Sequence, residues 1–262
     1  GIPAADVILA EALYPLFKFI LLIPNSALIS KCGKRKSLII ANLANCFSIL
    51  FYIIAQNFTF VVIGQFFSAM AYTIKGMAET NLLYDSLPKD ENRSKKFARI
   101  DGQGTSSYYY IDAISSVASG FLYVINGYLP LFLCLIFCGI STFISYRFKE
   151  TGTTSEDSIK LKTYMKDLRK SFKYMFQSSR LRYLMIFGAI LSGFMGCLVS
   201  LRSATLEQIG ISEEYFGIIF AILGIISGIT SRRQNVFHEK FKNKTLAVLA
   251  VPTSVSCMLI GL

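Results

Sequence analysis

Long apolar runs alternate with short polar segments along the whole chain, and this alternation predicts its architecture. An α-helix needs about 20 mostly apolar residues to cross a bilayer. We therefore predict an all-α protein, a polytopic bundle of helices that crosses a membrane several times. The expected spans cover residues 7–29, 37–54, 60–83, 105–125, 128–146, 183–201 and 215–231, and a further span begins at residue 246.

The composition agrees with a membrane protein, and the position of the charges indicates its orientation. Of the 262 residues, 53% are hydrophobic and 16% are charged, whereas about a quarter of the residues of a soluble domain are charged. A net charge of +11 would by itself suit a nucleic-acid binder. However, 24 of the 27 Lys and Arg lie in four alternate connections, at residues 30–36, 88–100, 147–182 and 232–244. Loops of this kind face the cytoplasm, so we predict a multi-pass protein of the cell membrane that contacts lipid and binds no nucleic acid.

The longest basic connection divides the chain. Between residues 159 and 176, apolar positions at helical spacing are interspersed with Lys and Arg, which predicts an amphipathic helix at the membrane surface. This helix is either a linker between two halves of a bundle or a regulatory lipid sensor. The predicted organisation is one half at residues 1–147, a linker at 148–182 and the start of a second half at 183–262. Because the chain begins with Gly1 and ends inside an apolar run, we expect a piece of a longer protein.

Small residues spaced four apart predict close packing between helices. They form one series in the run at 215–231 and shorter series in two other runs. The residues are Gly217, Ala221, Gly224 and Gly228; Ser116 and Gly120; and Gly188, Ser192 and Gly196.

Ionisable side chains interrupt several apolar runs, and they are the candidates for a substrate or proton site. Such residues usually face a bundle interior or a water-filled cavity. Lys75 and Glu79 are one helical turn apart and can pair. They form either a neutralised structural pair or a protonatable group with its partner. The candidate set is Lys75, Glu79, Asp112, Tyr72, Lys18 and Glu11.

Few residues favour catalysis or metal binding. The six cysteines form no CxxC pair, and the chain has a single His. We therefore expect no metal site, no disulfide and no cofactor. A membrane-embedded enzyme would need His, Asp, Glu or Cys clustered at one depth, and it stays an alternative beside a non-transporting receptor or scaffold.

The first basic turn carries a motif. It reads Ser26-Ala27-Leu28-Ile29-Ser30-Lys31-Cys32-Gly33-Lys34-Arg35-Lys36, which resembles the pattern G-x-L-a-D-R-x-G-R-R/K of the major facilitator superfamily of transporters. The resemblance implies two six-helix halves, of which this chain would cover the second to ninth helices. It also implies a secondary transporter, not an enzyme, that moves a small molecule by alternating access.

The chain departs from the family pattern in ways that bear on proton coupling. Ser30 replaces the acidic residue of the motif, and Ser26 replaces its first Gly. Gln65 stands where many proton-coupled members have Arg, and residues 115–121 lack the Gly-Pro-rich antiporter motif. Proton-coupled efflux is therefore weakened as an expectation, although it stays open.

Asp85 lies at the same end of its predicted helix as the basic turn. With Ser30 in place of the acid, we predict that Asp85 pairs with Lys31 or Arg35 and holds the cytoplasmic side closed. The alternative is a solvated charge at a helix end. The candidates for this gate are Ser30, Lys31, Gly33, Lys34, Arg35 and Asp85.

Overall fold

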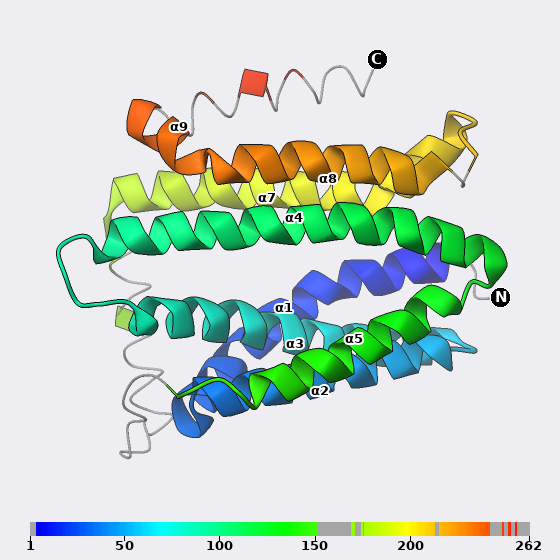
Figure 1. Ribbon diagram of the computed structural model, residues 1–262, viewed down its shortest axis with the longest axis horizontal. Coiled ribbons are helices and arrows are strands. Elements are labelled where there is room, and N and C mark those ends of the chain that lie inside the picture. Colours follow the sequence, from blue (N-terminus) through cyan, green and yellow to red (C-terminus); the bar gives the residue numbers. More distant parts are fainter. Residues whose placement is uncertain are drawn as a thin grey trace. The chain divides into compact units, whose positions relative to one another are not determined.

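The computed structural model describes residues 4–150, 169–170, 174, 176–212, 215–241, 248, 251–252 and 255. Every regular element in these residues is an α-helix, which confirms the predicted class (Figure 1). Three helical segments are long and apolar enough to cross a membrane: Leu9–Cys32, Lys34–Ile53 and Phe58–Ser86. Shorter apolar helices cover Leu129–Ser145, Leu181–Gly196 and Phe216–Arg232. The predicted eighth span and the predicted amphipathic helix at 159–176 lie mostly outside the described residues.

The chain divides into two compact units that interleave along the sequence. The first unit comprises Gly1–Ser86 and Ile125–Ile209, and the second comprises Leu87–Val124 and Gly210–Leu262. The division expected from the sequence follows chain order, with the linker at 148–182 between two halves. That division stays a prediction.

The first unit is built around α3. Its helices are α1 (Ala4–Cys32), α2 (Lys34–Ile53), α3 (Phe58–Ser86), α5 (Leu129–Ser145) and α7 (Ser179–Gln208). Helix α3 packs against both α1 and α2, and α2 also packs against α5 (Figure 1). Small side chains allow these close approaches, since Ala69, Ala71 and Ala78 of α3 are fully buried.

Aromatic side chains fill the space where the helices diverge. The ring of Phe66 on α3 meets Phe17 on α1 edge to face, with centroids 5.6 Å apart. The neighbouring Phe67 stacks on Phe51 of α2 at 5.7 Å. Such ring pairs stabilise packing beyond their buried area, so α3 is held from both sides.

Buried polar groups join α2 to α5. Asn42 is almost fully buried and donates a hydrogen bond to Ser145 Oγ at 2.8 Å. Cys138 donates to the carbonyl oxygen of Asn42 at 3.3 Å, and Ser141 donates to its Oδ1 at 3.4 Å. In apolar surroundings an unsatisfied polar group is costly, so this network fixes which faces of α2 and α5 meet.

In the second unit, α8 (Phe216–Arg232) packs on α4 (Arg93–Ile125), and α9 (Gln234–Phe241) follows α8. The predicted role of the small residues of α8 is confirmed, because Gly217, Ala221, Gly224 and Gly228 are all buried. An added Cβ on Gly224 would lie 3.0 Å from the side chain of Ala113 on α4. By contrast, an added Cβ on Gly188 or Gly196 of α7 would meet no described atom within 4 Å, so the packing role of that series stays a prediction.

Several helices extend beyond the apolar runs. Helix α4 begins at Arg93, within the connection predicted at 88–100, and α9 lies within the connection predicted at 232–244. Helix α1 likewise continues to Cys32, past the end of its apolar run. Hydropathy marks where a helix leaves the lipid, whereas Lys, Arg and Ala continue a helix well in water.

Candidate functional site

The basic turn (residues 30–36) is almost entirely helical and contains one break. Gly33 separates α1 from α2 and has a φ of 83°, a conformation that other residues adopt only with strain. Its N–H donates to the carbonyl of Ile29 at 3.0 Å, and its own carbonyl accepts the Ser37 hydroxyl at 2.7 Å. A Cβ at position 33 would lie 2.9 Å from Glu150 Oε2. Backbone conformation and close approach therefore both require glycine here.

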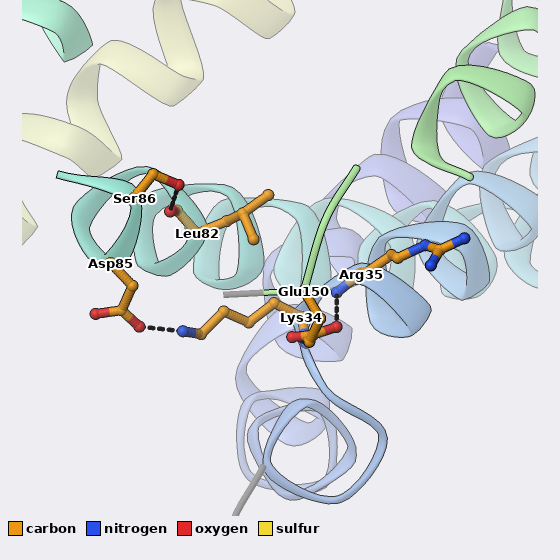
Figure 2. A network of polar contacts seen from close by, with 6 residues as sticks. All are labelled: Lys34, Arg35, Leu82, Asp85, Ser86 and Glu150. Carbon is orange, nitrogen blue, oxygen red and sulfur yellow. Dashed lines mark hydrogen bonds and ion pairs between the residues drawn. The ribbon is translucent and has the colours of Figure 1, made fainter. Parts of the chain in front are cut away.

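Glu150 is distant from the basic turn in the sequence, but its side chain binds the first turn of α2 (Figure 2). The N–H of Lys34 donates to Glu150 Oε1 at 2.8 Å, and the N–H of Arg35 donates to Oε2 at 2.9 Å. The first N–H groups of a helix have no partner within the helix, and a negative charge is favourable there. The Glu150 carboxylate thus acts as the N-terminal cap of α2, and the sequence analysis did not identify it.

Asp85 does belong to this site, but with a different partner from the one predicted. It forms an ion pair with Lys34, and neither Lys31 nor Arg35 takes that place. The Arg35 side chain points away from Asp85 (Figure 2) and donates to the carbonyl oxygen of Tyr146 at 2.6 Å. The side chains of Lys34 and Asp85 are 17% and 37% exposed, so this is a partly solvated pair and not a buried one.

Ser30 takes no part in these contacts to the turn. Its hydroxyl donates to the carbonyl of Ser26 at 3.1 Å, within its own helix. The acid that the family motif has at this position is therefore not replaced functionally by the serine.

The candidates on α3 lie on its open side. Tyr72 is 54% exposed, Glu79 is exposed, and Lys75 is half-buried. Among the ion pairs of the described residues there is none between Lys75 and Glu79, so the i, i+4 pairing that the sequence allows is not formed here.

A second contact lies on α1. The Lys18 ammonium lies 5.4 Å from the centre of the Tyr14 ring, within cation–π range. Tyr14 was not predicted, but it shares a helix face with Glu11 and Lys18 and was detectable by spacing.

Asp112 lies on α4 and belongs to the second unit, whereas the candidates on α1 and α3 belong to the first unit. It is half-buried, and the adjacent Ala113 packs against Gly224 of α8. No ion pair of Asp112 occurs within the part of the chain that the structure describes. That same part contains no group of three or more His, Cys, Asp or Glu side chains suited to a metal ion.

Known proteins that resemble this chain indicate its family. The family model of the Major Facilitator Superfamily matches residues 1–262. The chain is also similar to an uncharacterized MFS-type transporter, YxaM, from Bacillus subtilis (strain 168). The two are 29% identical over 148 residues, which covers 53% of this chain and 36% of that protein. No solved structure matches the chain.

The family model covers the whole of this chain, and the motif at the basic turn resembles the pattern of the same family. The chain belongs to the major facilitator superfamily of membrane transporters.

Proposed function

We propose that this chain forms part of a secondary transporter of the cell membrane, which exports a small molecule by alternating access and has its basic turn in the cytoplasm. The observation that carries the proposal is the open side of α3. Tyr72 and Glu79 are exposed on a helix that is apolar enough to span a membrane. A charge facing lipid costs about 2.5–3.5 kcal/mol near the bilayer centre, so this side of α3 needs water or a polar ligand.

The depth of these residues suits a central site. Lys75 precedes Asp85 by ten residues, which is about 15 Å along a helix at 1.5 Å per residue. That is about half of the 30 Å hydrocarbon thickness. Glu79 is one turn nearer the end that carries Asp85. Substrate and coupling-ion sites of secondary transporters lie near the midplane.

Glu79 and Asp112 are the proposed proton carriers. A carboxylate changes its protonation when its surroundings alternate between wet and dry, and that change can couple proton movement to transport. Lys75, four residues before Glu79 on α3, is the proposed partner of Glu79 or a contact of the substrate.

The Lys34–Asp85 pair has a narrower role than a bridge across the protein. It joins α2 to α3, two helices of the same unit. Its proposed contribution to the gate is to fix the shape of the basic turn, which then presents a constant surface on the cytoplasmic side.

The test uses the full-length protein in proteoliposomes that enclose a pH-sensitive dye. Small molecules are screened for solute-evoked proton movement, with and without an imposed pH gradient. Glu79→Gln or Asp112→Asn should abolish the dependence on the gradient, whereas Glu91→Gln, which removes an exposed carboxylate outside the spans, should not. Unchanged coupling in both of the first two variants would exclude this proton mechanism, and solute uptake that equilibrates without any gradient would exclude active export.

A further inference from the structure

We infer that Glu150 supplies the acid that the basic turn lacks at Ser30, and that it is the positioning residue that aims Lys34 at Asp85. The inference concerns how the proposed gate is built, and it rests on the proposed function only for its consequence in transport. Its geometry stands on the contacts around Gly33, which can be measured without a substrate.

Within the residues that the structure describes, the Glu150 carboxylate binds two successive backbone groups and no flexible side chain. Both of its oxygens are engaged, one by the N–H of Lys34 and one by the N–H of Arg35. Two bonds to adjacent peptide groups fix the orientation of the first turn of α2. They thereby fix the direction in which both side chains leave the backbone.

Those two side chains leave in different directions. Lys34 reaches Asp85 on α3 (Figure 2). Arg35 donates to the carbonyl oxygen of Tyr146, just past the end of α5. Tyr146 and Glu150 lie on the same segment, four residues apart. The segment after α5 thus makes two contacts with α2. Glu150 binds the backbone of α2, and the carbonyl of Tyr146 binds the guanidinium of Arg35. The side chain of Lys34 binds α3 instead.

Position explains why the acid works from residue 150. An acid at residue 30 would lie in the last turn of α1, which ends at Cys32. Negative charge is unfavourable at the C-terminal end of a helix and favourable at the N-terminal end. From residue 150, the same charge reaches the start of α2 and avoids the end of α1. Ser30 meanwhile bonds within its own helix, and glycine at position 33 gives Glu150 the room it needs.

This arrangement also gives the proposed gate a link to the long connection. Glu150 immediately precedes residues 151–182 in the sequence. Any change that draws residue 150 away from the turn removes the cap of α2 and releases the constraint on Lys34.

Hydrogen–deuterium exchange of the full-length protein in lipid nanodiscs tests the inference directly. In Glu150→Gln, peptides that contain residues 34 and 35 should exchange about fivefold faster, the factor that corresponds to a typical N-terminal cap. Gln has nearly the same shape, so folding is retained. Glu91→Gln removes an equal charge from the connection between α3 and α4, and it should leave this exchange unchanged.

A double variant tests whether the position of the acid matters. Adding Ser30→Asp to Glu150→Gln returns an acid to the turn, but at the C-terminal end of α1, so it should restore little of the lost protection. If exchange at residues 34 and 35 is the same in Glu150→Gln as in the wild type, Glu150 is not the cap. If the exchange rises and Ser30→Asp fully reverses it, the position of the acid at residue 150 is not what caps α2. Neither result depends on transport, so failure of this inference and failure of the proposed function are distinguishable.

Discussion

Replacing Gly217 with alanine should force α4 and α8 apart. An added Cβ at this position would lie 2.7 Å from the carbonyl oxygen of Ser116. Ordinary contacts begin at 3.4 Å, so the new methyl group is about 0.7 Å too close. The obstructing atom belongs to the backbone of α4 and cannot move by a change of rotamer. The two helices must therefore separate along the row of small residues of α8, which also includes Gly224 and Gly228.

Two opposing terms set the size of the effect. Overpacking of this kind costs about 1–3 kcal/mol, and a gap of 0.5–1 Å loses about a quarter to a half of the dispersion energy across it. Against this, alanine favours a helix over glycine by up to about 1 kcal/mol. Gly120→Ala is the matched control, because its Cβ would lie 3.8 Å from the Gly217 Cα. The propensity gain cancels between the two variants, so we expect Gly217→Ala to be less stable than Gly120→Ala by about 1–3 kcal/mol.

The measurement is equilibrium unfolding of the full-length protein in mixed micelles with increasing denaturing detergent. The unfolding midpoint should fall for Gly217→Ala and should stay the same or rise for Gly120→Ala. Equal midpoints in the two variants would show that α4 and α8 do not approach at Gly217 as closely as described. The prediction that the small residues of α8 allow close helix packing would then be refuted.

Three further predictions follow from polar contacts. Asp85→Asn and Lys34→Gln should each lower stability slightly, and a double-mutant cycle should give a coupling of about 0.2–1 kcal/mol that shrinks in high salt, because the pair is partly solvated. Asn42→Ala should cost about 1–2 kcal/mol in detergent unfolding, because the cross-helix bonds between α2 and α5 are lost and buried groups are left without partners; a cost near zero would contradict the network. A hydrogen bond from Lys96 lowers the pKa of Asp90 below its usual value, so the contribution of this pair at the start of α4 should be present above the unfolded-state pKa and be lost as the pH falls through the lower folded-state pKa. In carboxylate NMR titrations Lys96→Gln should raise the pKa of Asp90, and an unchanged value would exclude Lys96 as the cause.

The sequence was sufficient for the class of fold and for one packing surface. Apolar runs predicted the helices because lipid requires both apolar side chains and internally satisfied backbone groups. The glycines of α8 were interpreted correctly because close helix approach has a simple spacing rule. Helix ends were less accurate. Helix α4 starts at Arg93, where polarity indicated a loop, since polarity reports the lipid boundary and not the end of the backbone hydrogen bonding.

The site was predicted only where its residues lie close together in sequence. Asp85 was placed beside the basic turn, because both lie at the same end of neighbouring helices. The predicted partner of Asp85 was wrong. The choice among the basic side chains Lys31, Lys34 and Arg35 depends in part on the carbonyl of Tyr146, which binds Arg35. Glu150 was missed because it binds backbone N–H groups more than 100 residues away, and no pattern of side chains marks such a contact.

The single residue between α1 and α2 has a mechanical consequence. Gly33 is the only residue between Cys32 and Lys34, and hydrogen bonds cross it on both sides, from Gly33 back to Ile29 and from Ser37 back to Gly33. A connection this short has no slack, so α1 and α2 cannot tilt independently at this end. A displacement at this end that keeps these bonds moves both helix ends together. It therefore also moves the turn whose Lys34 and Arg35 bind Glu150 and Asp85.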